Sequence, residues 1–298
     1  MSFTYLMEKI RAHQFDSVPF RHLEVLDFFN EKHFAEITTS PEVALRPFTD
    51  DTSLIEGLKE HGFAPISFPG TTDNIGAYLK WHAGRRPHDN VDTCEGVGIT
   101  FRLMSAGSPL LEDLNAFFNS DPFLDCVAEK FDIDRGKTYV DNGLQKYLDG
   151  YEISPHPDIR RKALTYMINV NPGANSENEN IHTHYLEFDA PYRYVGDYWK
   201  YNPGTDCCWV PWEWCRTVKR QTQNNSFVMF SPSPETLHAV RARYDHLPAQ
   251  RTQFYGNLWY TENPQLMKPH WADFVITPTP EKKHFVSFKD RVKRVLTG

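Results

Sequence analysis

The chain has 298 residues, with 32 Lys or Arg and 39 Asp or Glu, so its formal charge is −7. This acidic balance disfavours nucleic acid or an anionic membrane as a partner. A hydrophobic fraction of 40% with 24% charged residues is typical of a globular chain. No apolar run approaches the roughly 18 residues that a membrane span requires. A polar N-terminus and only five cysteines lead us to expect a cytoplasmic protein without a disulfide framework.

The pattern over residues 1–137 predicts a mostly helical N-terminal flank. It begins with a strand over residues 19–26, followed by a helix that Asn30 caps and that runs through Ile37. Apolar residues at helical spacing predict further helices, the last interrupted near Pro122. These helices are expected at residues 51–62, 71–81 and 109–131.

From residue 138 the chain changes to short β-branched or aromatic segments, separated by Pro, Gly, Asn and Asp. Repeated short segments of this kind predict an antiparallel sandwich or barrel. They cover residues 139–151, 163–170, 182–188, 226–230, 238–240 and 251–260. We expect one domain over residues 1–298, with its β core at 138–262. A C-terminal extension at 263–298 is expected to end in a basic amphipathic helix docked on the core.

The sharpest chemical feature is the pair His156-x-Asp158. Residues i and i+2 of a strand point to the same face, so this imidazole and this carboxylate can bind one metal ion. The pattern alone is weak, because 13 His and 39 acidic residues give roughly two such matches by chance. His22-x-Glu24 is indeed a second match, which we interpret as structural.

Two later residues support a metal centre. An apolar strand pattern at 226–230 and a Pro-rich turn precede His238, which places His238 at the start of a strand. Two His and one carboxylate suit non-haem Fe(II) and leave coordination positions open. Arg251 opens the next strand, and a buried Arg is suited to bidentate capture of a carboxylate.

Taken in order, these motifs resemble the Fe(II)/2-oxoglutarate-dependent dioxygenases, and most closely their prolyl-4-hydroxylase-like branch. The resemblance covers about residues 139–260 and rests on the order Tyr147-x-x-Gly150, His156-x-Asp158, an apolar strand ending at Asn169, then His238 and Arg251. It implies a mainly β fold with flanking helices around a double-stranded β-helix core of the jelly-roll or cupin-like type.

The resemblance also implies roles for individual residues. The iron ligands would be His156, Asp158 and His238. Arg251 would hold the distal carboxylate of 2-oxoglutarate, Tyr147 would hydrogen-bond the same co-substrate, and Asn169 would line the pocket. The spacing between His238 and Arg251 is longer than the family's usual spacing, so Arg241 and Arg243 are alternatives. We favour Arg251 because it opens a strand.

The activity that the resemblance implies is hydroxylation of an unactivated C–H bond of a small molecule, such as a sugar or an amino-acid derivative. 2-Oxoglutarate would be oxidatively decarboxylated to succinate and CO2. The implied cofactors are Fe(2+), 2-oxoglutarate and O2, with ascorbate as a candidate reductant. Asp158 itself argues against the halogenating relatives, which carry a small residue at that position.

Other residues support competing hypotheses. His182, His184 and Glu187 resemble half of a cupin metal motif, and would make the protein a non-redox, cupin-like ligand-binding or metal-binding barrel. Metal-dependent hydrolysis is a third hypothesis, which leaves Arg251 without a role. Residues 190–215 are rich in Tyr and Trp, and form either a surface loop that covers the barrel or a lid over the iron site.

Overall fold

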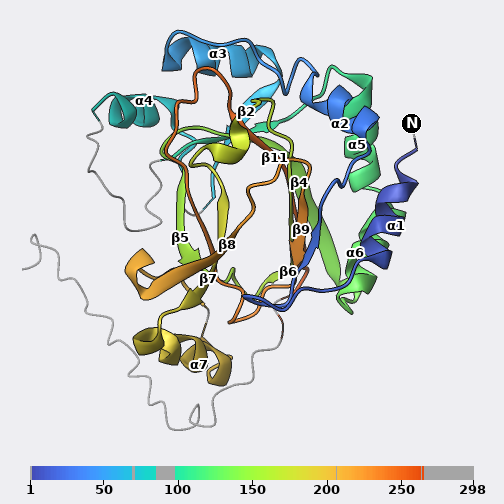
Figure 1. Cartoon of the computed structure of the whole chain (residues 1–298), viewed down its shortest axis with the longest axis vertical. Coiled ribbons are helices and arrows are strands. Elements are labelled where there is room, and N and C mark those ends of the chain that lie inside the picture. The colour runs from blue at the N-terminus through green and yellow to red at the C-terminus, as the bar shows by residue number, and fades with distance from the viewer. Residues whose placement is uncertain (1, 69–70, 85–97, 206, 263, 265–298) are drawn as a thin grey trace, which may run out of the picture.

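The computed structural model of the chain describes residues 2–68, 71–84, 98–205, 207–262 and 264. In these ranges the strands are β1 Leu23–Val25, β2 Phe63–Ile66, β3 Thr100–Leu103, β4 Thr138–Tyr147, β5 Glu152–His156, β6 Lys162–Asn169, β7 Thr183–Phe188, β8 Cys215–Arg220, β9 Phe227–Phe230, β10 His238–Arg241 and β11 Arg251–Tyr260. They form two antiparallel sheets (Figure 1). The large sheet has the order β1-β9-β6-β11-β4-β3-β2, and the small sheet has the order β5-β10-β7-β8.

From β4 onward the chain winds back and forth between the two sheets. Strands β4, β6, β9 and β11 belong to the large sheet, and β5, β7, β8 and β10 belong to the small one. Eight strands wound in this way form a double-stranded β-helix, or jelly roll. The predicted fold class, a mainly β jelly roll with flanking helices, is confirmed.

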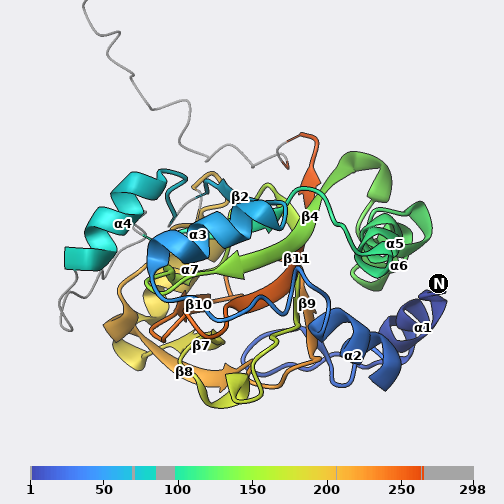
Figure 2. The same ribbon diagram turned by 90° about the horizontal axis from the view of Figure 1, so that it is seen from above.

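The helices surround this core. They are α1 Thr4–Ala12, α2 Glu31–Thr38, α3 Asp51–Glu60, α4 Ile75–Gly84, α5 Pro109–Phe118, α6 Asp121–Lys130 and α7 Arg193–Tyr201. Figure 2 shows α1, α2, α5 and α6 on the outer side of the large sheet. Figure 1 shows α3 and α4 at one end of the sheets and α7 at the other. Within the described ranges no helix has the length and apolar character needed to cross a membrane.

Local sequence signals placed several helix ends correctly. Asn30 caps α2, and its side chain accepts a 2.8 Å hydrogen bond from the backbone nitrogen of His33. The interruption expected within the helical segment 109–131 is present, since the segment forms two helices, α5 and α6, with the break at Asn119 and Ser120. Pro122 lies in the first turn of α6, where its missing N–H group costs no helical hydrogen bond.

The N-terminal flank contains more strand than the sequence indicates. The predicted strand at 19–26 is confirmed as β1, while β2 and β3, which extend the large sheet, and β8, the edge of the small sheet, were not predicted. Pro65 in β2 argues against a strand in sequence, but β2 is an edge strand, where an absent N–H group is tolerated. The basic amphipathic helix expected within residues 263–298 lies outside the described residues.

Two apolar clusters lie on opposite faces of the large sheet. The larger cluster joins the sheet to the helices, with Phe118, Phe123 and Tyr166 in edge or tilted ring contacts. The smaller cluster lies between the two sheets and consists of Phe20, Met167, Tyr185, Val228 and Phe230. The space between the sheets is therefore lined with apolar side chains next to the polar residues described below.

One backbone position tests the packing of the large sheet. Gly256 in β11 pairs with Tyr166 of β6, and a Cβ atom at residue 256 would overlap the buried Tyr166 ring. Overpacking costs about 1–3 kcal/mol or more, so Gly256→Ala should lower the free energy of unfolding by about 3 kcal/mol in urea denaturation. Gly76→Ala in α4, where the new Cβ meets only Asn74 at 3.5 Å, is the control and should not destabilise. Equal losses would contradict this packing.

Candidate metal centre and co-substrate pocket

The structure brings His156, Asp158 and His238 together between the sheets. His156 is the last residue of β5 and His238 the first of β10, and these two residues are paired in the strand register. Asp158 follows β5 in a left-handed conformation (φ 67°), which Asp tolerates better than most residues. Its carboxylate lies 3.4 Å from Nε2 of His156 and 3.8 Å from Nε2 of His238. The three candidate ligand atoms all lie within 4.8 Å of one another.

Both imidazoles are held in the form that binds metal. Nδ1 of His156 lies 2.8 Å from the carbonyl oxygen of Ser154, and Nδ1 of His238 lies 2.9 Å from that of Thr236. A carbonyl oxygen can only accept, so each Nδ1 donates its proton there, and Nε2 is the nitrogen of each ring that faces Asp158. Burial, together with His156, lowers the pKa of His238 to about 3. Imidazoles oriented in this way by backbone carbonyls fit a metal ion.

The carboxylate of Asp158 is held by two neighbours on β6. Lys162 donates a 2.7 Å hydrogen bond to Oδ1, and Thr165 donates a 2.9 Å hydrogen bond to Oδ2. Burial alone would raise the pKa of Asp158, but the ammonium of Lys162 keeps that pKa well below its usual range. Asp158 is therefore an oriented anion. Sequence reasoning missed Lys162, although a basic residue at the start of a buried strand is a usable signal.

Arg251 lies at the start of β11 and reaches from the large sheet to the small one. Its Nη2 donates to Oγ1 of Thr183 at 3.2 Å and to Oε1 of Gln253 at 2.9 Å. Its Nη1 is buried and has no hydrogen-bond partner in the described part of the chain. The residue is only 3% exposed. A buried guanidinium with an unused donor edge fits an anionic ligand, because an uncompensated buried charge is costly.

Tyr147 packs against this guanidinium. It is the register partner of Arg251 at the end of β4, and the Arg251 guanidinium carbon lies 4.5 Å from the centre of its ring. Gln145 satisfies both of its amide atoms when its oxygen accepts from Arg102 and its nitrogen donates to the Tyr147 hydroxyl at 2.6 Å. That hydroxyl then keeps its own proton for a further acceptor.

Asn169 lies behind the pocket wall. Its Nδ2 donates to the carbonyl oxygens of Gln221 and Gln223 at 3.0 and 3.1 Å, and its Oδ1 accepts a 2.6 Å hydrogen bond from Gln253. Gln253 in turn accepts from Arg251. The amide of Asn169 is thus used within the protein, in a chain of hydrogen bonds that orients the guanidinium.

The two alternative arginines bind a carboxylate of the chain itself. Nε of Arg241 lies 2.9 Å from Oε1 of Glu152, and Nη2 of Arg243 lies 2.9 Å from Oε2. Glu152 is buried at 3% exposure. Both guanidinium groups are thus already engaged by an internal carboxylate, which makes them poorer candidates than Arg251 for binding a dicarboxylate.

The rival group of His182, His184 and Glu187 does not form a metal site among the described residues. His184 pairs with Ala239, the residue after His238, so it points to the opposite face of the small sheet. There it bonds Thr217 at 2.9 Å, while Glu187 forms a 2.6 Å ion pair with Arg216. Among the described residues these side chains do not converge on one point, so the geometry gives no support to the alternative hypothesis of a metal site there.

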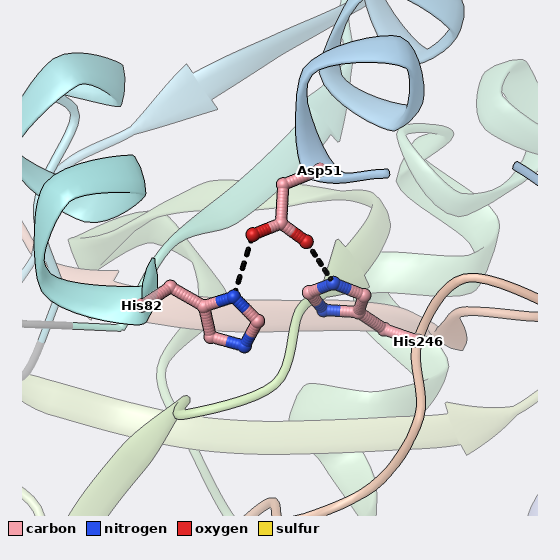
Figure 3. Close-up of side chains that lie close together, drawn as sticks. All are labelled: Asp51, His82 and His246. Atoms are coloured by element: carbon pink, nitrogen blue, oxygen red, sulfur yellow. Dashed lines mark hydrogen bonds and ion pairs between the residues drawn. The ribbon is translucent and has the colours of Figure 1, made fainter. Parts of the chain in front are cut away.

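In a second group of His and Asp side chains, shown in Figure 3, every ring nitrogen takes part in a hydrogen bond within the protein. Nδ1 of His82 lies 2.6 Å from Asp51 and Nε2 lies 3.0 Å from Asp149, so both ring nitrogens face carboxylates and donate. Nδ1 of His246 accepts from the backbone N–H of Asp149 at 2.8 Å, which leaves the His246 proton on Nε2, 2.8 Å from Asp51. Neither ring offers a free lone pair, so this group is a hydrogen-bonded network and not a metal site.

The aromatic insertion at residues 190–215 joins β7 to β8, contains α7, and contacts the segment that carries the candidate ligands. The backbone nitrogen of Val210 donates to the carbonyl oxygen of Pro155, and Nη2 of Arg160 donates to that of Trp199, both at 2.8 Å. Several of its aromatic side chains are exposed, namely Tyr194, Tyr198, Tyr201 and Trp209. The insertion therefore lies beside the candidate centre and presents rings at the surface.

No protein-family model and no curated protein matches the sequence. Among solved structures, the chain is similar to a Pseudomonas putida prolyl-4-hydroxylase (12% identity, 70% of this chain, 98% of that chain, TM-score 0.34). It is also similar to a 2OG-Fe(II) oxygenase family oxidoreductase from Burkholderia pseudomallei (12% identity, 77% of this chain, 100% of that chain, TM-score 0.32). A third similar structure is EctD from S. alaskensis with bound Fe (13% identity, 76% of this chain, 84% of that chain, TM-score 0.31). Similarity this distant assigns no role to any residue of this chain.

The protonated network of Figure 3 predicts a pH dependence of stability. The hydrogen bond to Asp149, with a further contribution from Asp51, raises the pKa of His82 despite burial. The protonated His82 therefore makes its full contribution to the free energy of unfolding below the unfolded-state pKa of about 6.5. That contribution is lost as the pH rises through the pKa of His82 in the folded state. Urea unfolding between pH 6 and 9 should show the wild type losing stability relative to His82→Gln. Parallel curves for the two proteins would contradict the assignment.

Proposed function

We propose that the protein is an Fe(II)- and 2-oxoglutarate-dependent dioxygenase that hydroxylates an unactivated C–H bond of a small molecule. The observation that carries the proposal is a two-His, one-carboxylate group next to a buried arginine with an unused donor edge. Such a group occupies one face of an octahedral ion and leaves positions for a chelating ligand and for O2.

The distance between the candidate metal ligands and Arg251 suits an extended diacid. His238 pairs with Tyr185 on β7, and Val240 pairs with Thr183, which is the hydrogen-bond partner of Arg251. The Arg251 contact therefore lies two strand residues, or about 7 Å, along the sheet from His238. A five-carbon 2-oxo diacid can chelate the metal at one end and reach the guanidinium at the other.

In this proposal each side chain has a definite task. His156, Asp158 and His238 hold Fe(II), with Lys162 and Thr165 keeping the carboxylate oriented. Arg251 binds the distal carboxylate of 2-oxoglutarate. The hydroxyl of Tyr147 donates to that carboxylate, while Asn169 acts through Gln253 as a positioning residue.

Bound Fe(II) would supply the activation of O2, so that R–H, O2 and 2-oxoglutarate give R–OH, succinate and CO2, one oxygen atom entering each of the alcohol and succinate. The protein contributes position and exclusion of water. Phe230 packs edge-on to the ring of His238 at 4.9 Å, and the apolar cluster around Tyr185 borders the site. Ascorbate is proposed as the reductant that keeps the iron ferrous.

The aromatic insertion supports a substrate with a flat or ring-shaped face, such as a sugar or an amino-acid derivative. Tyr198 and Trp209 are 53% and 41% exposed on a segment that contacts Pro155 and Arg160, on either side of the candidate ligands. Exposed rings beside a reactive centre offer stacking surfaces at low entropic cost. Substrate is proposed to approach the iron past this insertion.

Iron binding tests the ligand assignment. We expect His156→Ala or His238→Ala to lose the one Fe(II) that the wild type binds, because two remaining ligands cannot complete the triad. His184→Ala, on the other face of the small sheet, is the matched control and should retain iron. Metal content after anaerobic loading and desalting is the measurement. Retention of iron by His156→Ala, with loss in His184→Ala, would refute the site.

Co-substrate affinity tests the role of Arg251. Removing one partner of a buried charge pair costs 2–5 kcal/mol, so Arg251→Gln should weaken 2-oxoglutarate binding by at least about 30-fold. Arg243→Gln is the control, because Arg243 is bound to Glu152, and its affinity should stay near that of the wild type. The measurement is an anaerobic titration of the visible band of the iron complex with 2-oxoglutarate. Equal affinities in the two variants would exclude Arg251 as the anchor.

A further inference from the structure

A third group of His and carboxylate side chains lies at the edge of the large sheet, away from the candidate iron site. His22 directly precedes β1 and Glu24 lies within it, and the backbone of Asp16 is hydrogen-bonded to that of His22 in both directions, at 2.8 and 3.0 Å. His22 and Glu24 are two residues apart on an extended segment, so they share a face. One ligand atom from each of the three side chains lies within 4.8 Å of the other two.

His22 has the hydrogen-bond pattern of the two candidate iron ligands. Its Nδ1 lies 2.8 Å from the carbonyl oxygen of Phe20, two residues earlier, as in His156 with Ser154 and His238 with Thr236. Nδ1 is therefore engaged by this carbonyl, and Nε2 is the ring nitrogen that remains for a ligand. His22 is completely buried, and its Nε2 has no hydrogen-bond partner among the residues that the structure describes.

This nitrogen faces a carboxylate. Nε2 of His22 lies 3.7 Å from Oδ2 of Asp16, which is too long for a hydrogen bond and leaves room for a metal ion between the two atoms. The ring cannot easily turn away, because it stacks on Tyr185 at 5.8 Å and packs edge-on to Phe20 at 5.6 Å. The donor atom is thus fixed and unsatisfied, in contrast to both rings of the network in Figure 3.

Lys219 only partly compensates the two carboxylates. This residue of β8 forms an ion pair with Glu24, and its Nζ lies 4.0 Å from Oδ2 of Asp16. The two carboxylates and the one ammonium together carry a net charge of −1. A hollow of about 510 Å³, whose lining includes Asp16 and Glu24, adjoins the group and has room for metal-bound water.

We propose that Asp16, His22 and Glu24 bind a divalent transition-metal ion, represented by Zn²⁺, at this sheet edge. One imidazole nitrogen and two carboxylate oxygens are ligands that Zn²⁺ accepts, with water in the fourth position. The backbone carbonyl of Phe20 supplies the outer partner that metal-binding histidines use. Binding displaces the ammonium of Lys219 from Glu24. The site is independent of the iron proposed above.

The test uses the full chain with the iron site disabled, His156→Ala/His238→Ala, and Zn²⁺ as the probe in isothermal titration. We expect one Zn²⁺ to bind, and Glu24→Gln or His22→Gln added to this background to weaken its affinity by at least tenfold. His82→Gln in the same background, which alters the network of Figure 3, is the control and should leave the affinity unchanged. Circular dichroism checks that each variant is folded.

Lys219→Met supplies a readout that a purely structural role would not give. Removing a competing ammonium should tighten Zn²⁺ binding severalfold, whereas loss of a stabilising ion pair alone would leave it unchanged or weaken it. Absence of Zn²⁺ binding in the His156→Ala/His238→Ala chain, equal affinity after Glu24→Gln, or weaker binding after Lys219→Met would each overturn the proposal. None of these results depends on whether the protein is an oxygenase.

Discussion

The pairing of β5 with β10 is the constraint on which the candidate metal centre depends. It brings His156 opposite His238, with ring centroids 4.3 Å apart. A slip of one residue would turn one of these rings to the other face of the sheet. His184 follows the same rule. It pairs with Ala239, one residue after His238, and its side chain therefore points to the other face, toward Thr217. Strand register therefore selects which histidines can share a metal ion.

Some buried charges around the candidate centre have an oppositely charged partner within the protein, whereas the charge of Arg251 has only neutral hydrogen-bond partners in the ranges that the structure describes. The charge of Asp158 is balanced by Lys162, and that of Glu152 by Arg241 and Arg243. Arg251 by contrast has hydroxyl and amide partners, with one donor nitrogen unused among the described residues. A fold that buries a cation in this way gives up some stability, which a bound anion would restore. The proposed binding of a carboxylate ligand by Arg251 rests on this difference.

Within the described ranges, three groups of His and carboxylate side chains lie close enough to share a cation, and hydrogen-bond direction distinguishes them. In His22, His156 and His238 a backbone carbonyl holds the proton on Nδ1 and leaves Nε2 as a donor to metal. His82 has a carboxylate at each ring nitrogen, so both of its nitrogens are used in hydrogen bonds to Asp51 and Asp149. Closeness of His and Asp side chains is thus insufficient. The partner of the second ring nitrogen decides what the group can bind.

Alternation and capping, which are local properties of the chain, predicted an antiparallel sandwich or barrel and the cap at Asn30. The resemblance carried by the order of the motifs added the jelly-roll class and the roles of His156, Asp158, His238 and Arg251. Tertiary structure decided the rest. Only the folded chain shows Lys162 on Asp158, the outward orientation of His184, and the unsatisfied nitrogen of His22, which sequence alone had led us to regard as structural. These features depend on contacts between residues of different strands or turns, and neither periodicity nor composition encodes which side chains meet there.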